Sequence, residues 1–215
     1  MRKKNIIIGS LVTVAAIAGL ELYKNNFKIN DSNFYKSELV HRETMLIDTE
    51  ERMFYTKPEK KPLNVSIKVY KGIRILELYG DDNLIGRFRI ALGSAPTGDK
   101  EKEGDNKTPE GKYYICTRND KSKYTLFLGL SYPNVEDASR GLENDLISDS
   151  EFREVQSNIH IGKRPAWDTS LGGELGIHGG DTNNDWTSGC IAVSDDDIRI
   201  IWEYTKMETP VEIYK

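Results

Sequence analysis

From Leu63 onward the chain alternates apolar and polar residues, the pattern of β-strands with one buried and one exposed face. The alternation covers three segments, 65–69, 73–78 and 84–90, with turn residues between them at 71–72 and 80–83. Short strands joined by tight turns are the simplest structure with this pattern. The sequence therefore predicts a sheet that starts near residue 63.

The second half of the chain predicts further strands and a few helices. A charged loop at 93–111 precedes a strand at 112–117, an apolar run at 125–132, one or two surface helices within 136–159, a helix at 195–206 and a closing strand at 209–214. Ser194 is the predicted N-cap of the helix at 195–206, and Ile198, Ile201 and Trp202 share one of its faces. These elements predict a mainly β domain with a few covering helices.

The N-terminus has the pattern of an export signal. Arg2, Lys3 and Lys4 precede an apolar run at 6–20, which at 15 positions is shorter than the roughly 20 residues of a usual membrane-spanning helix. Residues 1–24 are therefore predicted to be a signal anchor, and a signal peptide cleaved near residues 16–18 stays open. The basic tip predicts that the rest of the chain lies outside the cytoplasm, secreted or anchored at the membrane.

Composition divides the remaining 191 residues, from 25 to 215, into a linker and one domain. Residues 25–61 are strongly polar and end in a lysine- and proline-rich stretch, so they are predicted to be a stalk. Residues 62–215 are predicted to be a single domain of ordinary core size. The net charge of −4 comes from interspersed signs, which argues against nucleic acid as the principal partner.

The two cysteines lie in different surroundings. In an exported protein Cys116 and Cys190 could form a disulfide. Cys116, however, lies in the predicted strand 112–117, where a small buried thiol is unremarkable. Cys190 follows Gly189 in a predicted loop, where a reactive thiol is expected.

His178 lies 190 − 178 = 12 positions before Cys190, with glycines and polar residues between them. A thiol attacks acyl groups as thiolate, so a catalytic cysteine needs a base such as imidazole within reach. Ser188 and Gly189 are predicted to shape an oxyanion site, with the amides of Gly189 and Cys190 directed at the developing charge. This chemistry requires no metal and no cofactor.

The segment from His178-Gly179 to Thr187-Ser188-Gly189-Cys190 resembles the signature of the L,D-transpeptidase catalytic domain family, also called YkuD-like. The stretch 108–111, Thr-Pro-Glu-Gly, resembles the element that precedes a core strand in that family. The resemblance implies a β-rich, sandwich-like catalytic domain over 62–215. It also implies a thioester between Cys190 and a peptidoglycan stem peptide, followed by transfer to an amine of a second stem.

The motif also departs from the commoner family form. That form is Ser-His-Gly-Cys, a hydrophobic residue, then Arg or Asn, whereas this chain has Ser188 at the second histidine and Ala192 at the polar position. The variant resembles a branch whose members are less uniformly cross-linking enzymes. Hydrolysis by the same pair, as an L,D-carboxypeptidase or amidase, therefore stays an alternative.

Several other residues are candidates for substrate binding, each with a structural alternative. They are His160, Arg164, Gly179, Trp186 and Thr187. His160 is as well explained by a structural role, Arg164 by a pair with surface acids, and Trp186 by packing. Asp185 could orient His178, but a backbone carbonyl has that role in the relatives.

Three other classes of function share part of this pattern. A papain-like peptidase places its cysteine before its histidine, the reverse of the order here. A zinc peptidase could use His160, His178 and Asp181, but it would leave Cys190 without a role. A non-catalytic wall-binding module is favoured by the missing second histidine and is opposed by the Cys190 motif.

Overall fold

The computed structural model describes residues 53–215. The predicted export segment 1–24 and most of the predicted stalk 25–61 lie outside the described residues. Within 53–215, none of the helices has the length and apolar character needed to span a membrane.

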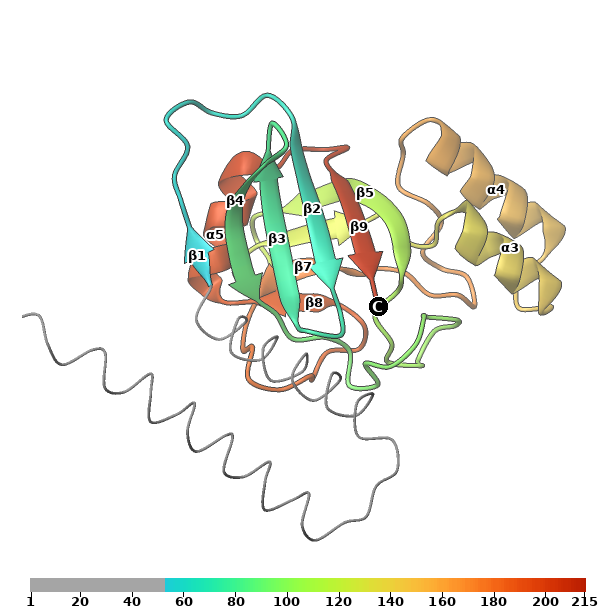
Figure 1. The fold of residues 1–215 in the computed structure, drawn as a ribbon. Coiled ribbons are helices and arrows are strands. Elements are labelled where there is room, and N and C mark those ends of the chain that lie inside the picture. Colours follow the sequence, from blue (N-terminus) through green and yellow to red (C-terminus); the bar gives the residue numbers. More distant parts are fainter. Residues whose placement is uncertain (1–52) are drawn as a thin grey trace, which may run out of the picture. The chain divides into compact units, whose positions relative to one another are not determined.

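The described chain forms a mainly β fold around one curled sheet of nine strands (Figure 1). The strands are β1 (Phe54–Tyr55), β2 (Val65–Tyr70), β3 (Ile75–Gly80), β4 (Asn83–Arg89), β5 (Gly111–Asn119), β6 (Phe127–Leu130), β7 (Gly176–Gly179), β8 (Ile191–Val193) and β9 (Pro210–Tyr214). Their order in the sheet is β1-β4-β3-β2-β9-β5-β6-β7-β8. The hairpins β2–β3 and β3–β4 follow the predicted alternation, and the mainly β prediction is confirmed.

The long strand β5 joins the two halves of the sheet. Its first residues pair with β9 and its later ones with β6, and the β5–β6 register shifts between Ile115 and Thr117. Such an irregularity bends a strand and increases its twist. After β4 the chain reaches the opposite edge, where Ala91 forms a bridge with Ala192. The sheet therefore curls back on itself in a sandwich-like arrangement.

The core lies between the two halves of the curled sheet. Buried side chains come from nearly every strand and from the last helix, and include Ile67, Leu78, Ile115, Leu128, Ile177, Ile198 and Ile201. Burying such side chains stabilises the fold by roughly 1.5–3 kcal/mol each. The core thereby fixes the positions of the short strands β7 and β8.

Within 53–215 the structure contains three helices, of which α5 packs against the sheet. They are α3 (Val135–Glu143), α4 (Asp149–His160) and α5 (Asp195–Tyr204). The Ser194 hydroxyl accepts a hydrogen bond from the Asp197 amide, which confirms the predicted N-cap of α5. The pair α3–α4 lies to one side of the sheet and packs around a small cluster of its own that includes Ala138 and Val155 (Figure 1).

Some predicted positions differ in the structure. The sequence predicts a strand that includes Ile73, but Ile73 lies in a turn at 71–74 and is 40% exposed. Arg74 has a φ of 55°, so the chain reverses over four residues before β3 begins. The strand β1 comes from the end of the predicted stalk and pairs with β4 at Arg87 and Gly86.

Candidate active site

The predicted base and the predicted nucleophile belong to two neighbouring parallel strands, since His178 lies in β7 and Cys190 lies just before β8. His178 pairs with Ala192, and Ile177, a core residue, pairs with Ile191. Because successive side chains of a strand point to opposite faces, His178 and Ala192 share the face away from that core. Because Cys190 immediately precedes β8, its backbone lies two residues before the position paired with His178, a rise of roughly 6.6 Å along the strands.

The His178 ring is fixed by one hydrogen bond and by two aromatic rings. Its Nδ1 lies 2.9 Å from the Gly179 carbonyl oxygen, which can only accept, so Nδ1 carries the proton and Nε2 is the basic nitrogen. The Tyr124 ring stacks on the imidazole with centroids 4.5 Å apart. Trp186 contacts it edge-on at 5.8 Å. These contacts leave the imidazole buried and in one orientation.

Burial lowers the pKa of His178, and the hydrogen bond to the Gly179 carbonyl opposes that shift only in part. The imidazole is therefore neutral at pH 7 and can accept a proton. Gly179 itself has no room for a side chain, since a Cβ there would lie 2.3 Å from an Asp195 carboxylate oxygen. The glycine after the histidine is thus required by packing against the start of α5.

The Cys190 thiol is held mainly as the neutral form. Burial raises its pKa, the Gly176 amide and the Lys100 ammonium lower it, and Glu174 raises it. The Sγ atom also lies 3.7 Å from the Glu174 carbonyl oxygen, a suitable acceptor for the thiol proton. A thiol of this kind needs a neighbouring base to become a nucleophile at neutral pH.

Thr187 shapes the loop that carries Cys190. Its hydroxyl donates to the Cys190 carbonyl at 2.7 Å and accepts the Gly189 amide at 3.1 Å. Gly189 has a φ of +134°, and a Cβ there would lie 2.8 Å from the Lys107 carbonyl oxygen. Because Thr187 takes the Gly189 amide, the Cys190 amide is the remaining donor of the pair predicted for the oxyanion site. Ser188, the other residue predicted there, is exposed.

The other predicted residues divide into two groups. Trp186 and Thr187 lie beside the pair, whereas His160 is exposed at the end of α4 and Arg164 stacks over Trp167 at 4.7 Å. No described contact brings His160 or Arg164 to Cys190 or His178. Asp185 also has another role.

Asp185 anchors the segment between the histidine and the cysteine. Its carboxylate binds the Arg74 guanidinium at 2.7 Å and accepts the Leu92 amide at 2.8 Å. Burial raises the pKa of Asp185, but the hydrogen bonds from Arg74 and Leu92 lower it by a larger amount. The pKa of Asp185 therefore lies below the ordinary value. The Asp185 carboxylate is therefore ionised and already bound to Arg74 and Leu92. The group that orients His178 is the Gly179 carbonyl.

Cys116 and Cys190 are both free thiols, so the structure contains no disulfide between them. Burial raises the pKa of Cys116 to about 12, which makes it an unreactive thiol. Within 53–215, no group of three histidine, cysteine, aspartate or glutamate side chains is arranged to hold a metal ion. The zinc-peptidase alternative therefore finds no ligand set among these residues.

Sequence reasoning missed three residues at the site. Tyr124 reaches His178 because β6 and β7 pair, with Phe127 opposite His178. Glu174 reaches Cys190 through its backbone carbonyl, and Lys100 approaches from the loop at 93–110. Only the repeated lysines and acids of that loop gave a local signal for Lys100.

The fold and the placement of Cys190 and His178 on neighbouring strands agree with a comparison of the sequence with known protein families. The family YkuD, described as the L,D-transpeptidase catalytic domain, matches residues 64–213. The chain therefore belongs to the L,D-transpeptidase catalytic domain family.

Individual relatives are more distant. The Escherichia coli K12 protein named "Putative L,D-transpeptidase YafK" is 34% identical over 86 residues, which cover 37% of this chain and 35% of YafK. The chain thus matches about a third of that relative's length. The K307A mutant of Pgp2 from Campylobacter jejuni, titled a helical cell shape determining protein, aligns with a TM-score of 0.50 and 21% identity. That alignment covers 75% of this chain and 48% of Pgp2, and it supports the fold.

Proposed function

We propose that this protein is a cysteine acyltransferase that acts on peptidoglycan stem peptides, with Cys190 as nucleophile and His178 as general base. The observation that supports it most is the tautomer of His178. The Gly179 carbonyl oxygen lies 2.9 Å from Nδ1 and accepts its proton, so Nε2 is the nitrogen that can take a proton, and the β7–β8 register brings the backbone of Cys190 within two residues of the position opposite His178. Family membership supports the class of substrate.

The proposed reaction has two balanced halves. His178 Nε2 accepts the thiol proton while sulfur attacks the carbonyl of the bond to the terminal residue of the stem. The tetrahedral intermediate collapses to a thioester as that C–N bond breaks, and His178 returns the proton to the leaving amine. An acceptor amine then attacks the thioester and His178 takes its proton. A new amide bond forms as the C–S bond breaks, and His178 passes the proton to the Cys190 sulfur, which regenerates the thiol.

The Cys190 amide is the proposed oxyanion donor, since the Gly189 amide is already bound by Thr187. Tyr124 and Trp186 restrict the imidazole to one orientation, which favours proton transfer along one path. These contacts make Trp186 and Thr187 positioning residues in the proposal.

A covalent intermediate gives a direct test. The full-length protein, incubated with a tetrapeptide stem or an acylating carbapenem, should gain the mass of one acyl group on the peptide that contains Cys190. The change Cys190→Ala should abolish both labelling and turnover. The matched change Cys116→Ala should keep most of both, because that thiol is buried and its pKa is about 12.

Equal losses in the two cysteine variants would contradict the assignment of Cys190. Turnover without labelling at Cys190 would point to a different nucleophile.

The site of action is proposed to be outside the cytoplasm, where peptidoglycan lies. This rests on the family and on the basic and apolar segments predicted to export the chain. A reporter that is active only outside the cytoplasm, fused after residue 60, should give signal, and deletion of 6–20 should remove it. A silent fusion with the intact N-terminus would overturn the proposed location.

A further inference from the structure

Glu174 places an exposed acidic side chain directly beside the candidate nucleophile. The Cys190 sulfur lies 3.7 Å from the Glu174 carbonyl oxygen. Two bonds, roughly 2.8 Å in total, separate that oxygen from the Glu174 Cα, which therefore lies within roughly 6.5 Å of the sulfur. The side chain that starts at this Cα is exposed to solvent. An acyl group on the sulfur is therefore within reach of the Glu174 carboxylate.

The Glu174 carboxylate has no partner among residues 53–215. Its residue takes part in no ion pair there, and its one hydrogen bond is made by the backbone carbonyl. The lysines Lys100 and Lys107 of the loop at 93–110 pair with Asp105 and Glu101 instead. A carboxylate of this kind attracts cations and repels anions at short range. The charge of Glu174 is thus available to a ligand.

The backbone at Glu174 has a conformation that favours glycine. Its φ is 54°, in the left-handed region, where the Cβ of most residues meets steric strain. Asp and Asn tolerate this region through their short polar side chains, but glutamate does not share that property. Glycine would remove the strain, and the two preceding residues, Gly172 and Gly173, are glycines. A glutamate in this conformation indicates that its side chain has a use that offsets the strain.

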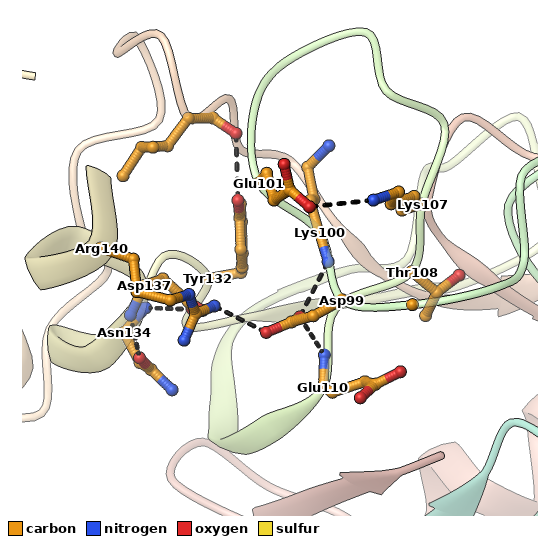
Figure 2. A network of polar contacts seen from close by, with 12 residues as sticks. Asp99, Lys100, Glu101, Lys107, Thr108, Glu110, Tyr132, Asn134, Asp137 and Arg140 are labelled. Carbon is orange, nitrogen blue, oxygen red and sulfur yellow. Dashed lines mark hydrogen bonds and ion pairs between the residues drawn. The ribbon is translucent and has the colours of Figure 1, made fainter. Parts of the chain in front are cut away.

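The loop that carries Glu174 is anchored on both sides. Before it, the Tyr132 hydroxyl donates to the Leu171 carbonyl at 3.2 Å (Figure 2). After it, the Leu130 amide donates to the Leu175 carbonyl at 2.8 Å. An exposed side chain on a fixed backbone loses less conformational freedom when it binds a ligand. Glu174 is therefore suited to recognise a charged group of the substrate.

The proposed acyl donor can bring the opposite charge to this place. The thioester forms at the carbonyl of the third residue of the stem. If that residue has a side-chain amine, as lysine has, the amine lies a few bonds from the thioester carbon. An ordinary lysine amine has a pKa of about 10.4, so it is an ammonium at pH 7.

We propose that Glu174 is a specificity-determining residue that binds the side-chain ammonium of the stem residue whose carbonyl Cys190 attacks. The inference rests on the proposed function and adds the class of donor, which is a stem with a diamino acid at its third position.

Binding to an inactive variant tests this charge pair apart from turnover. The full-length protein with Cys190→Ala is titrated by calorimetry with a tetrapeptide stem that has lysine as its third residue, and with the same peptide containing Nε-acetyl-lysine. Adding Glu174→Gln should weaken binding of the lysine stem about three-fold, within the range of exposed ion pairs, and leave the acetylated stem unchanged. High salt should remove the same difference, because it screens exposed charges.

Glu103→Gln is the matched control. Glu103 is also exposed and packs against the same loop, since a Cβ at Gly172 would lie 3.2 Å from the Glu103 Cβ. Its change removes one negative charge from this side of the protein without altering the residue beside the sulfur. Binding of both stems should stay unchanged in the Glu103 variant.

Unchanged binding of the lysine stem after Glu174→Gln, or equal weakening of both stems, would overturn the inference. So would an equal effect of Glu103→Gln, or no measurable binding of the lysine stem. Charge-dependent binding as expected, with no acylation once Cys190 is restored, would uphold the recognition and refute the proposed function. The two failures are therefore distinguishable.

Discussion

At the scale of single residues, the candidate site combines a neutral base with a neutral thiol. Burial lowers the pKa of His178 and raises that of Cys190, so the two pKa values move apart from each other. A preformed thiolate–imidazolium pair needs the opposite shifts. The proposed reaction therefore depends on proton transfer during attack, with charge on sulfur appearing only as the proton leaves.

This difference predicts the pH dependence of kcat/KM. The active form of His178 is neutral, and its pKa lies below the ordinary 6.5, so activity should fall on the acid side only below pH 6.5. His178→Ala should lower the rate by roughly 10² to 10⁴ and remove that acid limb. A pH-rate profile of the free enzyme measures both effects.

His160→Ala is the matched control for that profile, because His160 is exposed at the end of α4. It should change neither the rate nor the acid limb. An acid limb that survives His178→Ala and is lost in the His160 variant would transfer the role of base to His160.

The motif predicted Cys190 and His178 because the residue types that this chemistry needs lie together in one short segment of the sequence. Tyr124 could not be found in this way, since it lies 54 positions before His178 (178 − 124 = 54) and meets it only through β6–β7 pairing. Sequence analysis also proposed Thr187 only as a substrate contact and did not predict its hydrogen bonds within the loop. Its hydroxyl is used within the loop, which no sequence pattern reveals.

At the scale of elements, periodicity predicted the strands that are long enough to display it. The strands β2 to β4 have six or seven residues, β2 alternates in burial along its length, and α5 has a capped, amphipathic pattern. The strands β7 and β8 have four and three residues and are buried throughout, so no alternation is visible. Neighbouring strands impose their conformation, which explains why sequence analysis predicted the loop at Cys190 but neither of these two strands.

The internal charges of the loop at 93–110 give it a measurable acid sensitivity. Burial raises the pKa of Asp105, but hydrogen bonds from Lys100 and from three backbone amides lower it to about 2. Since the folded pKa is below the ordinary 3.8, the carboxylate stabilises the fold above pH 3.8. That contribution is lost as the pH falls toward 2.

Asp105→Asn should therefore lower the free energy of unfolding by roughly 2 kcal/mol at pH 7, with the difference vanishing near pH 2. Glu101→Gln is the matched control, since its carboxylate is 68% exposed and its pair with Lys107 should contribute little. Urea unfolding of both variants from pH 7 to pH 2 measures the difference. A constant deficit in the Asp105 variant at every pH would refute the electrostatic explanation.

At the scale of the whole domain, closure of the sheet builds the site. The bridges from Ala91 and Gly93 to the segment around Cys190 join residues about 100 positions apart (192 − 91 = 101). The loop that carries Cys190 is therefore held between β7, the loop at 93–110 and the segment that Asp185 anchors to the Leu92 amide. Site geometry should depend on the integrity of the whole sheet more than on any single helix.

The same closure bears on whether the thioester is transferred or hydrolysed. Both outcomes share the acyl-enzyme, and thioesters react more readily with amines than with water. The buried Lys71 ammonium binds the Gly98 and Thr108 carbonyls at 2.6 and 2.7 Å and Glu110 at 3.0 Å, so the loop that packs against Gly189 is braced. We expect a braced loop beside Cys190 to limit access of bulk water to the thioester.

We therefore expect transfer to an amine to dominate. With a tetrapeptide stem and an amine-bearing acceptor in excess, the full-length protein should yield a cross-linked product that has lost its terminal D-residue, as measured by mass spectrometry. Lys71→Met should loosen the loop and raise the share of hydrolysed tripeptide several-fold, because water then competes better for the thioester. Tripeptide as the sole product of the unchanged protein, at every acceptor concentration, would instead make this chain an L,D-carboxypeptidase that uses the same cysteine and histidine.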